Sequence, residues 1–177
     1  MSVNWWDSPV QQLDRESERE AEERQTRLTK PPGALGRLES LAIRLASMQG
    51  MVKPAINTPF ITIFVADHGV AEMGVSAFPQ GVTAEVVRNF SRGGAAISVL
   101  ANSIGAPLEV VNAGTVEPLE PLDRVVDARI SSGTKNLANK PAMDRGELER
   151  ALKIGEEALE RAISQGADIY IGGDMGI

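Results

Sequence analysis

Residues suited to chemistry gather in two short segments that each follow an apolar run. Asp67, His68 and Gly69 come directly after the first run, and residues 172–176 place Asp174 among glycines after the second. Glycines let the main chain approach a ligand closely, and successive N–H groups can surround an anion. A carboxylate in such a segment suits sugar hydroxyls or a developing positive charge. An ordinary turn leaving a strand has the same composition, so residues 172–176 admit both interpretations.

His68 is the only histidine in the chain, and there is no cysteine. One histidine cannot form a histidine-rich metal site, and the lack of cysteine excludes thiolate catalysis and cysteine ligands. A serine triad would need His68, but the sequence has no G-x-S-x-G segment. We therefore interpret His68 as a structural residue, hydrogen-bonded within its loop, and expect neither a metal ion nor a cofactor. Asp67 is better placed to meet a ligand or to orient the loop.

Phe78 lies in the glycine-containing segment 74–80 and is one of few aromatic residues, which make up 4% of the chain. On a loop beside a crevice, an aromatic side chain can form one wall for a flat ring. Phe78 can equally fill space in the core beneath its loop. The sequence leaves both alternatives open.

Apolar patterns define the elements that must position these residues. Residues 60–66 form a continuous apolar run, which is typical of a strand buried on both faces of a parallel sheet. Further strands are predicted at residues 108–111, 124–130 and 169–171. Helices are predicted at residues 82–90, with Thr83 as the cap, at residues 95–103, and from Asp144 as the cap to about Gln165.

The first 50 residues predict two helices and no strand. Ser8 and Pro9 predict the start of a solvated helix over residues 11–29, which is rich in Glu and Arg. Leucines and alanines recur at helical spacing between residues 35 and 46, as one apolar stripe. They predict a second helix that ends near Gly50.

The order of strands and helices predicts an α/β fold: a Rossmann-like, mostly parallel sheet with flanking helices. Ligands of such sheets bind beyond the carboxyl ends of the strands, so we expect residues 67–69, 112–114 and 172–176 to face one crevice. No helix follows the last segment, and the unit is therefore expected to be incomplete at its C-terminus. We assign residues 54–177 to this partial α/β domain and residues 1–53 to an N-terminal helical segment of a small domain.

The overall composition excludes several partners. The chain of 177 residues has a formal net charge of −6 and no basic patch, which argues against nucleic acid. No apolar run reaches the ~20 residues that a bilayer crossing needs, and no targeting signal is visible. We therefore expect no membrane partner. The absence of cysteine fits a reducing compartment, and we expect a cytoplasmic protein.

An ordered set of motifs resembles one known family. Residues 30–39, Lys-Pro-Pro-Gly-Ala-Leu-Gly-Arg-Leu-Glu, form the first motif. The others are residues 66–70, 74–79 with 82–83, 89–90 leading to 93–96, 133–136 with 141–143, and 173–177. Each motif is weak alone, but the ordered set is specific and covers nearly the whole chain from Lys30 onward. On these motifs the chain resembles the nicotinate-nucleotide:dimethylbenzimidazole phosphoribosyltransferase family.

The resemblance implies an activity and a set of substrate-binding residues. Members move phosphoribose from nicotinate mononucleotide to 5,6-dimethylbenzimidazole, which forms α-ribazole phosphate for the lower ligand of cobalamin. The resemblance assigns Asp174 to the ribose and the reacting nitrogen, Gly176 to a main-chain contact, and Phe78 and Val86 to the azole pocket. Asp67 joins this set because of its place after the first strand. Many members carry glutamate where this chain has Asp174, so a water or a shifted main chain is expected to complete the ribose contact.

The resemblance also implies that part of the machinery lies outside these residues. The family's general base is a glutamate in its C-terminal half, and its phosphate-binding loop lies there too. The catalytic residues are therefore expected beyond residue 177, and this fragment is expected to be inactive alone. Members are dimers, so the complete protein is expected to be a homodimer. The alternative function is a non-catalytic α/β module that binds an azole or a nucleotide.

Overall fold

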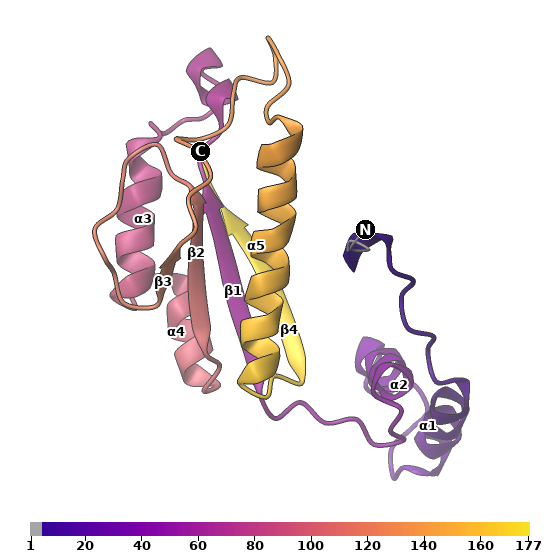
Figure 1. Ribbon diagram of the computed structural model, residues 1–177. Coiled ribbons are helices and arrows are strands. Elements are labelled where there is room, and N and C mark those ends of the chain that lie inside the picture. The colour runs from indigo at the N-terminus through magenta and orange to yellow at the C-terminus, as the bar shows by residue number, and fades with distance from the viewer. Residues whose placement is uncertain (1–4) are drawn as a thin grey trace. The chain divides into compact units, whose positions relative to one another are not determined.

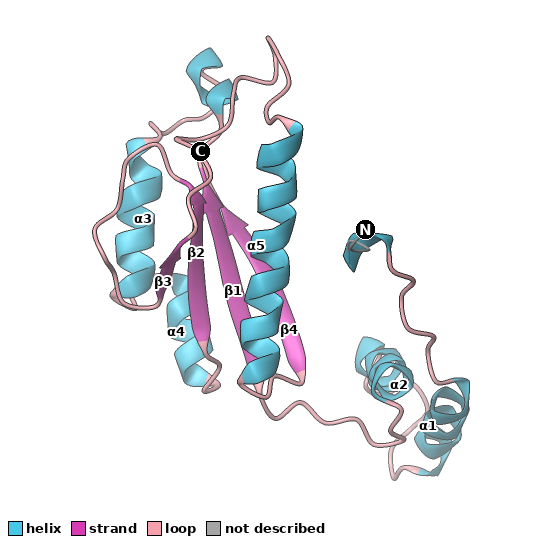
Figure 2. Cartoon of the chain, in the orientation of Figure 1, coloured by secondary structure: helices cyan, strands magenta, loops and turns pink. Residues whose placement is uncertain are grey.

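Figure 2 shows the computed structural model, which describes residues 5–177. The chain forms two compact units, of which the first ends at Ile56 and the second runs from Asn57 to Ile177. The first unit contains a short 3₁₀ helix, η1 (Trp5–Asp7), and the helices α1 (Arg15–Arg27) and α2 (Arg37–Gln49). The second unit contains β1 (Pro59–Ala66), η2 (Gly69–Met73), α3 (Gly81–Ser91), α4 (Ala96–Ser103), β2 (Leu108–Gly114), β3 (Val125–Asp127), α5 (Arg145–Ser164) and β4 (Ile169–Met175).

The sheet of the second unit has parallel strands in the order β3-β2-β1-β4. β1 lies in the middle and pairs with β4 from Pro59, opposite Ile169, to Val65, opposite Met175. On its other side β1 pairs with β2, which in turn pairs with β3. The predicted α/β fold with a parallel sheet is therefore confirmed.

Helices cover both faces of this sheet. α3 and α4 connect β1 to β2, whereas α5 connects β3 to β4. The two crossovers run in opposite directions across the sheet, so right-handed connections place their helices on opposite faces. Figure 1 shows α5 on one face and α3 and α4 on the other. Coverage on both sides explains why the sequence of β1 is a continuous apolar run.

The largest part of the core lies between the sheet and α3. Ile61, Ile63 and Val65 of β1 are buried and pack in one cluster with Val87 and Phe90 of α3. This packing fixes β1 and α3 relative to each other. It thereby also fixes both ends of the loop that joins them.

The helix α1 begins later than the sequence predicts, at Arg15. Asp14 caps it, because the Oδ1 atom of Asp14 accepts a hydrogen bond of 2.8 Å from the Ser17 N–H. The N–H of Asp14 in turn donates to the Ser47 carbonyl of α2 at 2.9 Å. This tertiary contact sets the start of α1, and the predicted start at residues 8–9 is wrong.

The helix α2 ends at Gln49, followed by Gly50 in the left-handed region (φ 62°), as the sequence predicts. Its apolar stripe does not pack as a single face. Ala46 is fully buried where α2 packs against α1, whereas Leu38 and Leu41 are 63% and 51% exposed. The small residues therefore bring the two helices together, and the leucines form an apolar surface that stays exposed in the described part of the chain.

The strand β4 is longer than predicted and continues to Met175. Residues 172–174 therefore belong to a strand, and their interpretation as a turn is wrong. The fit to β1 is close at Gly173, where a Cβ atom would lie 2.7 Å from the Ile63 Cδ1 atom, whereas a Cβ atom on Gly172 would meet no atom closer than 3.9 Å. Glycine at position 173 allows the strand to pair beside a large side chain.

Two further boundaries differ from the sequence prediction. α3 begins at Gly81, after Gln80, so Thr83 is a buried residue of its first turn and does not cap the helix. β3 is shorter than the predicted strand over residues 124–130. Arg124 has a φ of 61°, which is a turn conformation that no strand residue adopts.

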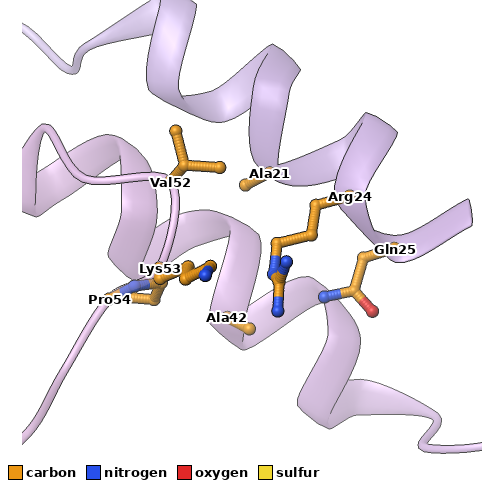
Figure 3. A pocket seen from close by; sticks show the side chains of 7 residues that line it. All are labelled: Ala21, Arg24, Gln25, Ala42, Val52, Lys53 and Pro54. Atoms are coloured by element: carbon orange, nitrogen blue, oxygen red, sulfur yellow. The ribbon is translucent and has the colours of Figure 1, made fainter. Parts of the chain in front are cut away.

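The first unit contains a cavity of about 250 Å³ between α1, α2 and the segment after α2, shown in Figure 3. Its lining consists of Ala21, Arg24, Gln25, Ala42, Val52, Lys53 and Pro54. The Oε1 atom of Gln25 is buried and has no hydrogen-bond partner within residues 5–177. None of the predicted substrate-binding residues lines this cavity.

Asp168 holds the start of β4 beside the start of β1. Its carboxylate accepts hydrogen bonds from the Asn57 N–H at 2.6 Å and from the Thr58 N–H at 3.0 Å. Its own N–H donates to the Thr58 carbonyl at 3.1 Å. The hydrogen bond from Asn57, and then that from Thr58, favours the charged carboxylate and lowers the pKa of Asp168 below its ordinary value.

We predict that the Asp168 carboxyl titrates below the ordinary aspartate pKa of about 3.9. A pKa that is lower in the folded state gives a stabilisation that is present above the unfolded-state pKa and is lost as the pH falls through the folded-state pKa. An NMR titration of the Asp168 carboxyl carbon measures the midpoint, and the Asn57 and Thr58 amide resonances should move with it. Those amide shifts should vanish in Asp168→Asn. A midpoint at or above the ordinary value contradicts the prediction.

Candidate functional site

The carboxyl ends of the strands meet at one edge of the sheet, where main-chain hydrogen bonds join them. The Asp67 N–H, after β1, donates to the Gly114 carbonyl at the end of β2 at 2.9 Å. The His68 N–H donates to the main-chain oxygen of Ile177, beyond β4, at 2.8 Å. The Thr134 N–H, in the segment after β3, donates to the Asp67 carbonyl at 2.9 Å. The segments predicted to face one crevice therefore do lie at one edge.

The strands β1 and β4 mark the point at which the strand order reverses. The chain passes from β1 to β2 and β3 on one side, and then crosses to β4 on the other side. Open α/β sheets bind ligands beyond the carboxyl ends of the strands at this point. Figure 1 shows the C-terminus and η2 at this end of the sheet. The candidate site is therefore the region where the residues after β1 meet those after β4.

Asp67 is a buried carboxylate, 1% exposed, that joins two of the loops at this edge. Its Oδ2 atom accepts a hydrogen bond of 2.7 Å from the Val116 N–H, in the loop after β2. Its Oδ1 atom is buried and has no hydrogen-bond partner within residues 5–177. Asp67 therefore orients the loop after β2 and retains one carboxylate oxygen for a further donor.

The loop after β1 packs closely against the segment before α5. A Cβ atom on Gly69 would lie 2.5 Å from the Thr134 carbonyl oxygen and 2.6 Å from the Asn136 nitrogen. The Gly69 N–H donates to Thr134 Oγ1 at 3.3 Å, and Asn136 Nδ2 donates to Glu72 Oε1 at 2.5 Å. Glycine is required for this approach, which makes one continuous wall of the two segments.

The chain leaves β4 across the end of β1. A Cβ atom on Gly176 would overlap the Ala66 carbonyl oxygen, so only glycine allows this crossing. The same position is 3.4 Å from the Nε2 atom of His68. The imidazole of His68 is exposed and forms no hydrogen bond to a described residue. The expectation that His68 is hydrogen-bonded within its loop therefore holds for its main chain only.

Asp174 lies inside β4, opposite Phe64 of β1. Its side chain is exposed and forms neither a hydrogen bond nor an ion pair with any residue from 5 to 177. Within residues 5–177 no side chain covers this carboxylate. A carboxylate at this place can bind hydroxyl groups or stabilise a developing positive charge.

The two residues predicted to line an azole pocket lie in different settings. Phe78 is 65% exposed, which excludes the alternative that it fills the core beneath its loop. Val86 is partly buried and packs from α3 against the core cluster. Gln80 joins the Phe78 loop to the strand ends, because its Nε2 atom donates to the His68 carbonyl at 2.9 Å and to the Ile177 main-chain oxygen at 3.2 Å.

Sequence reasoning missed most of the residues that hold this edge together. Thr134 and Asn136 stand in a recognisable motif, but their partners in η2 lie far away in the chain and have no local signal. Val116 acts through its main chain, which any residue type except proline supplies. Gln80 is an ordinary polar residue by composition. The contacts of the Gln80 side-chain amide become visible only when β1 and β4 are paired in three dimensions.

Ion pairs brace the loop between β2 and β3 against α3. Arg88 of α3 forms two hydrogen bonds of 2.9 Å to the Glu120 carboxylate, which lower the pKa of Glu120 to about 2. In the same loop, the Glu117 Oε1 atom lies 2.9 Å from the position of a Cβ atom on Gly81, the first residue of α3. Among the described residues, no group of three or more histidine, aspartate or glutamate side chains is arranged to hold a metal ion.

Comparisons with known proteins give one consistent result. A family model described as "Phosphoribosyltransferase" matches residues 10–177. The nicotinate-nucleotide–dimethylbenzimidazole phosphoribosyltransferases of Ectopseudomonas mendocina (strain ymp) and Pseudomonas aeruginosa (strain PAO1) are each 50% identical over 177 residues, which are 100% of this chain and 50% of theirs. The solved structure of the enzyme of that name from Thermus thermophilus superposes with a TM-score of 0.89 at 46% identity, over 93% of this chain and 50% of that one. The chain thus spans about half the length of the curated relatives it matches.

We predict that Gly69→Ala destabilises the second unit by about 2 to 3 kcal/mol, because the added methyl group meets main-chain atoms that cannot move independently. Gly155→Ala is the matched control, since no atom lies within 4 Å of a Cβ atom at that position in α5. Alanine in a helix is expected to stabilise there by about 0.5 to 1 kcal/mol. Urea denaturation followed by circular dichroism measures both values. Equal free energies of unfolding for the two variants would contradict the prediction, because they would show that the contact between Gly69 and residues 134–136 can accommodate a methyl group.

Proposed function

The chain belongs to the phosphoribosyltransferase family whose model it matches, and from this membership we propose that the whole protein transfers phosphoribose from nicotinate mononucleotide to 5,6-dimethylbenzimidazole. The products are α-ribazole phosphate and nicotinate, in the synthesis of the lower ligand of cobalamin. The curated nicotinate-nucleotide–dimethylbenzimidazole phosphoribosyltransferases that match the whole chain at 50% identity support the proposal.

The geometry at the ends of β1 and β4 supports this reaction class. The bond between C1′ of the ribose and the nicotinate nitrogen breaks, and its electron pair neutralises the cationic ring, so the leaving group needs no general acid. The ribose develops positive charge at C1′ as the bond breaks, and the exposed Asp174 carboxylate at the end of β4 is suited to stabilise it. This placement of an unpaired carboxylate at the reversal point of the sheet is the observation that carries the proposal.

The attacking azole forms the new bond through one ring nitrogen and must lose the proton of the other. A general base has to accept that proton. The family resemblance assigns this base to a glutamate outside residues 1–177. In our proposal these residues bind and orient the substrates: Asp174 and Gly176 contact the ribose side, Phe78 and Val86 face the azole, and Asp67 orders the loops between them.

Further properties belong to the same proposal. We propose that residues 1–53 contribute to a small domain and residues 54–177 to the catalytic domain, and that the whole protein is a homodimer, as the resemblance implies. We propose a cytoplasmic location and no nucleic-acid partner, which the absence of cysteine and the net charge of −6 support. Within residues 5–177, no helix combines the length and the apolar character needed to cross a bilayer.

The test is a transfer assay with the protein as its gene encodes it. Nicotinate mononucleotide and dimethylbenzimidazole should give α-ribazole phosphate and nicotinate in equal amounts, measured by liquid chromatography and mass spectrometry. Residues 1–177 alone should give no product, because the resemblance places the base elsewhere. Calorimetric binding of the azole without any product from the whole protein would support the non-catalytic module. Neither binding nor product would overturn both functions.

We predict that Asp174→Ala lowers kcat by about 10²-fold to 10³-fold, which is typical for the loss of one electrostatic contact to the transition state. Asp123→Ala is the matched control, since the Asp123 side chain is 83% exposed in the loop before β3. The control should keep wild-type kcat. An Asp174→Ala enzyme with unchanged kcat would remove this carboxylate from the reaction.

A further inference from the structure

We propose that Gln80 is a positioning residue of the transfer reaction, which rests on the function proposed above. Its side-chain amide ties the loop that carries Phe78 to the main chain at the ends of both β1 and β4. It thereby sets the distance between the wall for the azole and the site for the ribose.

The contacts of Gln80 span three segments that are distant in the sequence. Its Nε2 atom donates to the His68 carbonyl, after β1, at 2.9 Å and to the Ile177 main-chain oxygen, after β4, at 3.2 Å. The Ile177 oxygen also accepts the His68 N–H at 2.8 Å. One amide group therefore closes a ring of hydrogen bonds around the reversal point of the sheet.

The chemistry of this ring requires a donor at the end of the side chain. Both acceptors are main-chain oxygens, and a primary amide supplies two N–H groups from one nitrogen. A carboxylate of the same shape supplies none and would face two partial negative charges. Because Gln80 is half-buried, few water molecules can replace the lost donor, which increases the energetic cost of changing this glutamine to glutamate.

Gln80 is also coupled directly to the Phe78 loop. It is the residue before α3, with φ and ψ already helical at −59° and −29°, and only Pro79 separates it from Phe78. On the other side of the helix start, Glu117 lies close to Gly81. The start of α3 is thus fixed between the loop after β2 and the end of β4, and a shift of Gln80 moves Phe78 with it.

This arrangement affects the reaction through distance. The azole nitrogen must come close to C1′ while Asp174, on β4, faces the ribose. A misplacement of about 1 Å between the two substrates can cost about 10²-fold in rate even when each substrate still binds. Loss of the Gln80 tether should therefore lower kcat and leave both KM values nearly unchanged.

The experiment compares Gln80→Glu with the wild-type protein as its gene encodes it. The variant has the same shape and no donor, and the new charge at the start of α3 favours the helix, so the fold should be retained. Its kcat is expected to fall at least about tenfold, with both KM values within about threefold. Gln80→Ala should show the same pattern without a new charge. Gln12→Glu introduces the same charge at an exposed residue and should leave kcat unchanged.

A second readout does not depend on turnover. In the protein as its gene encodes it, hydrogen exchange of the His68 amide should become at least about tenfold faster in Gln80→Glu than in the wild type or Gln12→Glu, because the accepting Ile177 oxygen is released. An unchanged kcat in Gln80→Glu overturns the proposal, whether or not the KM values rise. An unchanged exchange rate of the His68 amide overturns it as well. If the wild-type protein makes no product, the proposed function fails, and the exchange rates still decide whether the tether exists.

Discussion

The parallel pairing of β1 with strands on both sides is the constraint on which the rest of the structure depends. β4 pairs with β1 from Pro59 to Val65, and β2 pairs with it from Ile61 onward. Because all strands run the same way, every loop that can carry chemistry leaves at the same edge. The position of the site is therefore a result of the strand order, and the individual loop residues decide only how closely the segments approach.

Close approach at this edge is achieved with glycine and with main-chain hydrogen bonds. Gly69 and Gly176 each lie where a Cβ atom would meet main-chain atoms at less than 3 Å. Asp67, buried at the centre, accepts from one loop with its carboxylate and from another with its carbonyl oxygen. These contacts leave little freedom for the main chain, so the exposed groups Asp174 and Phe78 project from a fixed framework. Such a framework suits a reaction in which the protein mainly orients two substrates.

Much of the fold could be predicted from local patterns, because the signals for β1 and α5 are local. The apolar run from Phe60 to Ala66 gives the central strand, and Asp144 caps α5 in a reciprocal capping box with Glu147. The start of α1 and the extent of β4 could not be predicted, since a contact to Ser47 sets the first and pairing with β1 sets the second. At the site, carboxylates and glycines drew attention by type. The role of Gln80 depends on two carbonyl groups that only the assembled sheet brings together.

The pairing of β1 with β4 also governs the order in which the protein can be built. About 100 residues separate the end of β1 from the start of β4. At a synthesis rate of roughly 5 to 20 residues per second, the central strand waits on the order of 5 to 20 seconds for its second neighbour. During that interval β1 has one open edge, and the long-range contact that closes it is entropically expensive to form. The carboxyl ends of β1 and β4, where the candidate site lies, can therefore come together only after the whole segment between the two strands has been synthesised.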